Sequence, residues 1–140
     1  MTNERWLICG GRKYGVVSDR YSAADMDRAH REVLMLNDQL DILVNHFGTP
    51  AVVITGGAPG ADTLADEWRT QRGYPGQVFK ADWNTLGRRA GIVRNTQMLA
   101  VLRVIKAAPK RVIAFPGTEG TLNMIQQATA AGIAVTKVGW

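Results

Sequence analysis

Two glycine-rich loops constrain the fold of this chain more than any other feature. Each follows a short β-branched run and precedes a helix-like stretch: residues 54–62 (ITGGAPGAD) and residues 115–121 (FPGTEGT). A strand that ends in a glycine turn and continues into a helix leaves backbone N–H groups unpaired at the positive end of the helix dipole. Such a place binds phosphate or another anion. Two of these loops in a chain of 140 residues suggest a nucleotide-like ligand.

Strand-like and helix-like patterns alternate along the rest of the chain. Strands and helices alternating at these lengths favour an α/β fold. We predict a single domain over residues 1–140, built on a doubly wound (Rossmann-like), mostly parallel five-stranded sheet with helices on both faces. We expect strands over residues 5–9, 51–54, 77–81, 111–115 and 133–138, and helices over residues 61–71, 92–107 and 120–131, besides a long first helix.

The first helix has the clearest signals. Ser22 is a good N-cap with Asp25 three residues later, and residues 48–50 (GTP) end the helix. Apolar residues recur every three or four positions and form one stripe: Met26, Ala29, Val33, Leu36, Leu40, Leu43 and Phe47. The helix carries more apolar residues than one buried face needs, and the extra residues predict a homo-oligomer that associates through the helices. They lie off the stripe: Leu34, Met35, Ile42 and Val44.

The expected topology brings four segments to one edge of the sheet. In doubly wound sheets, ligands bind beyond the carboxyl ends of the strands, where the strand order reverses. Residues 10–19, 56–62, 82–91 and 116–121 each follow an expected strand, and residues 82–91 are a polar connection. We therefore expect these segments to line one crevice.

The charge of the chain suits an anionic ligand. Seventeen basic and twelve acidic residues give a net charge of +5. Six basic residues fit solvated helix faces: Arg28, Arg31, Arg69, Arg72, Arg103 and Lys106. Five others lie in or just beyond the crevice loops, and they suit a polyanionic small molecule as well as DNA: Arg12, Lys13, Arg88, Arg89 and Arg94.

Composition and known motifs exclude several classes. No apolar run approaches the ~20 residues of a membrane span, the N-terminus lacks a signal-peptide pattern, and the single cysteine, Cys9, excludes an internal disulfide. We expect a cytoplasmic protein with no membrane contact, no metal and no cofactor. The Walker A and G-x-G-x-x-G motifs are absent, so P-loop hydrolysis and ordinary NAD dehydrogenase chemistry are not expected.

Several side chains near the loops carry a specific expectation. Asp62 begins a helix, where it would be a cap or accept a ribose hydroxyl. Arg94 lies at the expected start of the third predicted helix, where a positive charge is unfavourable unless an anion binds there. Trp83 and Tyr14 lie in loops of the same edge, where each would stack on a base or cover the core.

The chain resembles the SLOG superfamily, a Rossmann-like group that includes the Lonely Guy phosphoribohydrolases and DNA-processing protein A, and is most similar to its stand-alone YspA/YpsA-related branch. The resemblance rests on five segments in the expected order: residues 10–12 (GGR), 56–62 (GGAPGAD), 81–83 (ADW), 90–98 (AGIVRNTQM) and 115–121 (FPGTEGT).

In the Lonely Guy enzymes, a P-G-G-x-G-T-x-x-E loop holds the nucleotide phosphate and supplies a glutamate, and an upstream Arg–Lys pair assists N-glycosidic cleavage. The resemblance implies phosphate binding by Gly117, Gly120 and Thr121 and matches Arg94 to the arginine. Thr118 replaces the second glycine and Asn95 the lysine, while Met124 stands in place of the glutamate. Without a carboxylate to stabilise oxocarbenium charge or to activate water, the crevice can still bind.

The leading hypothesis is therefore a protein that binds a nucleotide or nucleotide-derived signal, such as an ADP-ribose or NAD-related molecule, for sensing or sequestration. A nucleoside-monophosphate phosphoribohydrolase using Asp62 or Asp82 is the alternative, and single-stranded DNA binding, by analogy with DNA-processing protein A, has weaker support. The predicted ligand-binding residues are Gly11, Arg12, Gly56, Gly57, Gly60, Asp62, Asp82, Trp83, Arg88, Arg94, Asn95, Gly117, Thr118, Glu119, Gly120 and Thr121.

Overall fold

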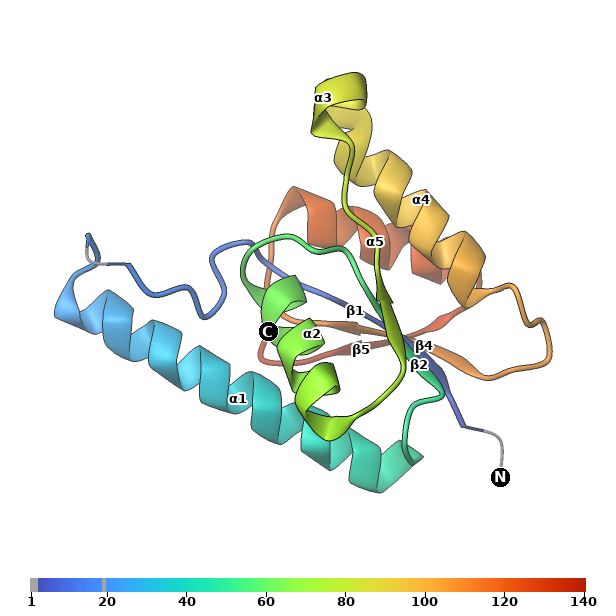
Figure 1. Ribbon diagram of the computed structural model, residues 1–140, viewed down its shortest axis with the longest axis horizontal. Helices are drawn as coiled ribbons and strands as arrows, with labels where there is room; N and C mark the ends of the chain where they lie inside the picture. Colours follow the sequence, from blue (N-terminus) through green and yellow to red (C-terminus); the bar gives the residue numbers. More distant parts are fainter. Residues whose placement is uncertain (1–2, 19) are drawn as a thin grey trace.

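A computed structural model describes residues 3–18 and 20–140 and contains one five-stranded parallel sheet (Figure 1). The strand order is β3-β2-β1-β4-β5. Met1, Thr2 and Asp19, which belong to the predicted domain of residues 1–140, lie outside the described residues. The strands are β1 (Arg5–Cys9), β2 (Val52–Thr55), β3 (Gly76–Val78), β4 (Lys110–Ala114) and β5 (Ala134–Lys137).

Helices cover both faces of this sheet, so the predicted doubly wound α/β fold is confirmed. On one face, α1 (Ala23–Phe47) and α2 (Ala61–Arg72) pack over Trp6 and Ile8 of β1. On the other face, α4 (Ala90–Leu102) and α5 (Glu119–Ala130) pack over Leu7 and Cys9. Successive side chains of a strand point to opposite faces, so one buried strand serves both cores.

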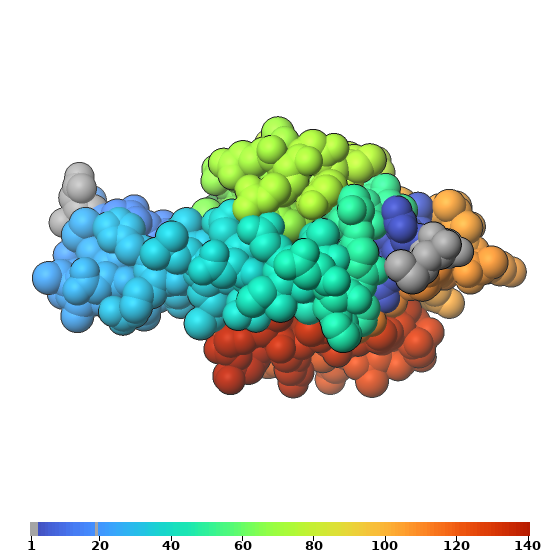
Figure 2. Space-filling view, turned by 90° about the horizontal axis from the view of Figure 1, so that it is seen from below, coloured from blue at the N-terminus to red at the C-terminus, as the bar shows by residue number. Residues whose placement is uncertain are grey.

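The long helix α1 follows its sequence signals. The Ser22 hydroxyl accepts a hydrogen bond from the Asp25 amide at 3.1 Å, and the helix ends before Gly48, as predicted. Leu36 and Leu40 of the apolar stripe are fully buried. Seen from below, α1 runs across the molecule with its outer surface uncovered (Figure 2). Of the residues off the stripe, Val44 packs against the core, whereas three are exposed: Leu34, Met35 and Ile42.

The predicted helix over residues 92–107 is wrong at both ends. The helix begins at Ala90 and ends at Leu102, and Ile105, expected on its buried face, is 52% exposed. The early end has a physical cause, because the Arg5 guanidinium donates to the carbonyl oxygens of Val101 and Leu102 at 3.0 and 3.1 Å. These carbonyl groups belong to the last turn, where helix carbonyls lack intrahelical partners, and the Val101 oxygen also accepts from the Val104 amide at 3.2 Å. The chain then turns away toward β4.

Two other segments also differ from the prediction. The polar connection over residues 82–91 contains a short helix, α3 (Trp83–Leu86), and a 3-10 turn, η1 (Gly87–Arg89), before α4 begins. The Asp82 carboxylate starts α3 by accepting from the Thr85 amide at 3.2 Å. Strand β3 covers Gly76–Val78 instead of residues 77–81, and all three of its residues are exposed at the edge of the sheet.

The strand order fixes where a ligand would bind. From β1, the chain builds β2 and β3 on one side and β4 and β5 on the other, so the order reverses between β1 and β4. Segments leaving the carboxyl ends of β1 and β4 separate there and leave a crevice. Within the described residues, no helix has the length and apolar character that crossing a bilayer requires.

Candidate functional site

A cleft of about 240 Å³ lies at the carboxyl ends of β1 and β4. Smaller and larger hollows of about 190 and 470 Å³ adjoin it, and all three share Arg12. Gly56 and Gly57 line the smaller hollow, and Gly117 lines the larger one. The cleft itself brings together ten of the predicted residues: Gly11, Arg12, Asp62, Trp83, Arg94, Asn95, Thr118, Glu119, Gly120 and Thr121.

The remaining three predicted residues line none of these hollows. Asp82 uses its side chain to cap α3, and Arg88 is exposed in η1. Gly60 is buried between loops: its φ is +84°, and a Cβ there would lie 2.2 Å from the Gly11 carbonyl oxygen. A glycine is therefore required at position 60 for a structural reason, because two backbone segments approach each other closely there.

Gly11 connects the two glycine loops. Its amide donates to the Pro116 carbonyl oxygen at 2.8 Å, and its carbonyl oxygen accepts from the Ala61 amide at 3.1 Å. The segment after β1 thus lies between the loop after β2 and the loop after β4. The two predicted loops share one edge of the sheet, but their polar groups are used differently.

The protein itself occupies the loop after β2. Asp62 is 4% exposed, and its Oδ2 accepts from the Ala58 amide at 3.2 Å. Arg94 donates from Nη1 to the Gly56 carbonyl oxygen at 2.8 Å. Ala61, at the start of α2, donates its amide to Gly11. The Ala58 and Ala61 amides, which were expected to face a phosphate, therefore donate to oxygen atoms of the chain itself.

Asp62 is also electrostatically unusual. Burial raises the pKa of its carboxyl to about 6, although the positive charge of Arg94 and the Ala58 hydrogen bond act in the opposite direction. A carboxyl with such a pKa changes charge near neutral pH. The side chain lines the cleft, so its charge is felt by whatever binds there.

The loop after β4 leaves its amides open. Thr118 is the N-cap of α5, but its side chain makes no capping hydrogen bond. The Leu122 amide is the first to donate back, to the Thr118 carbonyl oxygen at 2.9 Å. Among the described residues, no acceptor faces the three amides of the first turn, those of Glu119, Gly120 and Thr121. These residues line the cleft, so their N–H groups suit an anion.

Asn95 positions this first turn. It is buried, and its side-chain amide donates to the Gly120 carbonyl oxygen and to Asn123 Oδ1, both at 3.1 Å. Gln127 donates to the same Asn123 oxygen at 2.8 Å. Asn95, which replaces the lysine of the Lonely Guy enzymes, thus links α4 to α5 in this chain.

The cationic side chains divide into two kinds. Arg94 lies in the second turn of α4, because that helix begins at Ala90, so the argument from a charge at a helix start is wrong. Its Nε is buried without a hydrogen-bond partner among the described residues. Arg12 instead lies at the mouth of the cleft, with its guanidinium 5.6 Å from the centroid of the Trp83 ring. Trp83 is 47% exposed and offers a flat apolar surface.

Met124, in the position of the family glutamate, is fully buried in the core formed with Leu7 and Met98. It does not line the cleft, whose described carboxylates are Asp62 and Glu119. Burial raises the pKa of the Cys9 thiol well above its ordinary value, which makes the thiol a poor nucleophile.

Sequence reasoning missed several residues of this edge. Ala58, Gly91 and Met98 line the cleft, and Arg28 and Glu32 line the largest of the three hollows. Arg28 was expected to lie on a solvated helix face, and Glu32 carried no expectation. Their spacing of four residues places both on one side of α1, and this was the available signal.

Comparisons with known proteins identify the family of this chain. The model of the YspA, cpYpsA-related SLOG family matches residues 5–85, more than half of the chain. The chain therefore belongs to this family. It is also 36% identical over 95 residues to the Gene 61 protein of Mycobacterium phage D29, covering 63% of this chain and 71% of that protein. No solved structure matches. The loop after β4 lies beyond the residues that the family model matches.

Proposed function

We propose that this protein binds a nucleotide or a nucleotide-derived signalling ligand, an ADP-ribose or NAD-related molecule or a nucleoside phosphate, for sensing or sequestration. Family membership supports a nucleotide-related role. The observation that carries the proposal is the open first turn of α5: its three residues line the cleft together with Arg12, and their amides have no acceptor among the described residues. A phosphate would accept from these amides and pair with the guanidinium.

The other groups suit the rest of a nucleotide. Trp83 presents an exposed ring at the cleft, on which a base can stack. Asp62 lies deeper: its Oδ2 accepts from the Ala58 amide, and its other carboxylate oxygen can accept ribose hydroxyls. The loop after β2 then shapes the sugar site, while the phosphate binds at the loop after β4. This arrangement differs from the one expected from the sequence, in which both loops would bind phosphate.

Calorimetry against a panel of mono- and dinucleotides tests the proposal. We expect at least one member to bind, and we expect Arg12→Gln to weaken it about tenfold, because one charge-assisted contact is lost. Arg103→Gln is the matched control, since it removes the same charge from the opposite edge of the sheet. Failure of the whole panel at millimolar concentration contradicts the proposal, as does an equal effect of both variants.

The raised pKa of Asp62 favours a second candidate, a nucleoside-monophosphate phosphoribohydrolase. A carboxyl whose pKa is about 6 can exchange a proton near neutral pH, as acid–base catalysts do. Incubation with AMP and analysis for free base tests it. Release of base that disappears in Asp62→Asn establishes the enzyme, whereas binding without release leaves the ligand-binding proposal alone.

We also propose that the protein is a cytoplasmic homo-oligomer that associates through α1. Leu34, Met35 and Ile42 are exposed on this helix, and α1 is uncovered in Figure 2. Light scattering measures the mass in solution. A monomer at micromolar concentration contradicts the proposal, and a dimer that Leu34→Lys dissociates supports it.

A further inference from the structure

The largest hollow at this edge, of about 470 Å³, lies between the loop after β4 and the N-terminal half of α1. We call it the distal hollow. Gly11, Arg12 and Thr118 line both the distal hollow and the cleft. A ligand bound in the cleft can therefore extend into the distal hollow across a shared wall.

Of the residues at this wall, Gly11 lies against the loop after β4. A Cβ on Gly11 would lie 2.8 Å from the Pro116 carbonyl oxygen, and a Cβ on Gly117 would lie 2.9 Å from the Gly11 amide nitrogen. The two backbones thus touch without side chains between them. Thr118, the N-cap of α5, lines both spaces, so a phosphate bound at the first turn of α5 would lie beside the shared wall.

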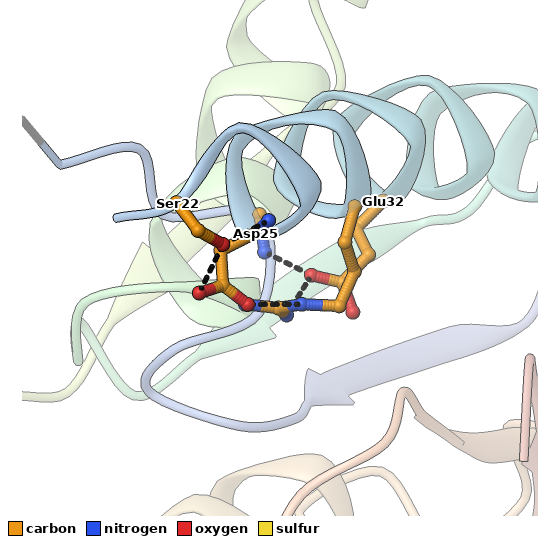
Figure 3. Close-up of polar contacts among 5 residues, drawn as sticks. Ser22, Asp25 and Glu32 are labelled. Atoms are coloured by element: carbon orange, nitrogen blue, oxygen red, sulfur yellow. Dashed lines mark hydrogen bonds and ion pairs between the residues drawn. The ribbon is translucent and has the colours of Figure 1, made fainter.

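The distal hollow carries an excess of positive charge. Arg12, Lys13 and Arg28 line it, against the single carboxylate of Glu32. Glu32 Oε1 accepts hydrogen bonds from the Gly15 amide and from Arg28 Nη1, both at 2.9 Å (Figure 3). These contacts fix the carboxylate and the guanidinium before anything binds. The hollow therefore offers a preorganised cation beside a carboxylate whose second oxygen, Oε2, has no hydrogen bond from the described residues.

Asp25 extends this arrangement to the N-terminus of α1. Its Oδ2 accepts a hydrogen bond from the Ser22 hydroxyl at 3.0 Å, and its Oδ1 lies 4.0 Å from Arg28 Nε (Figure 3). The cap of the helix and the wall of the hollow thus share one polar network. The network holds Arg28 on the side of α1 that faces the loop after β1.

Tyr14 provides an independent sign that a polar group belongs in this region. The side chain is 4% exposed and lines the distal hollow, and its ring packs on Phe115 with centroids 5.5 Å apart. Its hydroxyl is buried without a partner among the described residues. Buried hydroxyls in native proteins rarely lack a partner. Burial raises the pKa of Tyr14 to about 12, so the hydroxyl keeps its proton and can donate.

We propose that the distal hollow binds the outer half of a two-part ligand, namely a second phosphate and the sugar attached to it. Arg28 and Lys13 pair with the second phosphate. Glu32 accepts hydrogen bonds from sugar hydroxyls, and the Tyr14 hydroxyl donates to an oxygen of this phosphate–sugar half. The inference rests on the proposed function and deepens it. It makes a pyrophosphate-linked nucleotide, and not a nucleoside monophosphate, the preferred class of ligand.

The experiment compares AMP, ADP and ADP-ribose by calorimetry on the full chain at one salt concentration. We expect affinity to rise in that order, with about tenfold or more between AMP and ADP-ribose. Arg28→Gln should weaken ADP-ribose about tenfold and leave AMP unchanged, and Tyr14→Phe should weaken ADP-ribose by a smaller factor. Arg103→Gln, at the opposite edge, is the control for the loss of one charge.

The outcomes separate this inference from the function on which it rests. Equal affinities for AMP and ADP-ribose overturn the distal hollow but leave nucleotide binding intact. The same holds if Arg28→Gln weakens both ligands equally, or if neither Arg28→Gln nor Tyr14→Phe weakens ADP-ribose. If no nucleotide binds the unaltered protein, the proposed function fails and the inference fails with it.

Discussion

The two glycine loops look alike in the sequence, yet the structure uses them in opposite ways. After β2, the Asp62 carboxylate, Arg94 and the Gly11 backbone take the polar groups of the loop. After β4, the first-turn amides of α5 find no acceptor among the described residues, and they line the cleft. A strand, a glycine turn and a helix are therefore not enough to define an anion site. What matters is whether the chain supplies its own anion.

Position 62 explains the contrast. A carboxylate at the start of α2 can fold back onto the loop, because Asp62 is only four residues from Ala58. The corresponding loop after β4 has Thr121 in its buried position, and a hydroxyl carries no charge that would satisfy several amides. The chain's own groups close one loop, and the other leaves its first-turn amides without an acceptor among the described residues.

The largest effect expected from this contrast concerns the last glycine of each loop. Gly60→Ala should reduce the free energy of unfolding by about 3 kcal/mol, because φ is +84° and the Cβ would lie 2.2 Å from the Gly11 carbonyl oxygen. Gly120→Ala should change it by less than about 1 kcal/mol, since no atom lies within 4 Å of a Cβ there. Urea denaturation of both variants measures the difference. Equal losses contradict the assignment of a closed and an open loop.

Sequence patterns predicted the sheet and its edge well, because these depend on local signals. The strand over Arg5–Cys9 and the Ser22 cap were placed correctly, and ten of the predicted site residues line one cleft. Alternating apolar runs and glycine turns are read within a few residues of one another. The reversal of strand order then follows from general rules of connection.

Sequence patterns failed where distant residues decide the outcome. Arg5 ends α4 through hydrogen bonds to residues 96 and 97 positions away in the sequence. The sequence near Ile105 therefore contains no signal that this side chain is exposed. Arg94 reaches the Gly56 carbonyl oxygen across 38 residues, and this occupation of the loop was invisible before folding. The pairing of loop amides is a tertiary property, which a motif alone cannot define.

The next prediction separates the two arginines by which loop each serves. Arg94→Leu should lower the free energy of unfolding by about 2 kcal/mol, because the buried Gly56 carbonyl loses its donor and Asp62 loses a nearby cation. Arg12→Gln should change stability by less than about 0.5 kcal/mol, since this side chain is exposed at the mouth of the cleft. Denaturation and calorimetry together give both values. If Arg12→Gln lowers the free energy of unfolding as much as Arg94→Leu does, the division of the two arginines between a structural and a ligand-facing role is wrong.

A pH profile tests whether Asp62 is the internal anion of the cleft. Its folded-state pKa of about 6 exceeds the ordinary 3.8, so below pH 6 the carboxyl is neutral and repels a bound phosphate less. We expect ADP-ribose to bind about threefold to tenfold more tightly at pH 5 than at pH 7.5. A pyrophosphate ligand is chosen because phosphomonoesters titrate near pH 6 themselves.

Asp62→Asn is the control for this profile. It should flatten the pH dependence, because the titrating charge is gone while an oxygen can still accept from Ala58. The same shift predicts a sign for stability: between pH 3.8 and about 6 the folded state binds the proton more tightly, so this carboxyl lowers stability as the pH rises through that window. A profile that is identical in the variant would show that another group titrates.

The smallest expected effects come from two hydroxyls, one in the first turn of α2, which contacts the loop after β2, and one in the loop after β4. Thr63 Oγ1 donates to the Ala58 carbonyl oxygen at 2.8 Å, so Thr63→Val should lower the free energy of unfolding by about 1 kcal/mol and leave ligand affinity unchanged. Thr118 makes no capping hydrogen bond and lines the cleft, so Thr118→Val should leave stability unchanged and weaken a phosphate-bearing ligand about threefold. Both substitutions keep the shape of the side chain and remove only its hydroxyl. A reversed pattern, with affinity lost at Thr63 and stability lost at Thr118, would exchange the roles of the two loops.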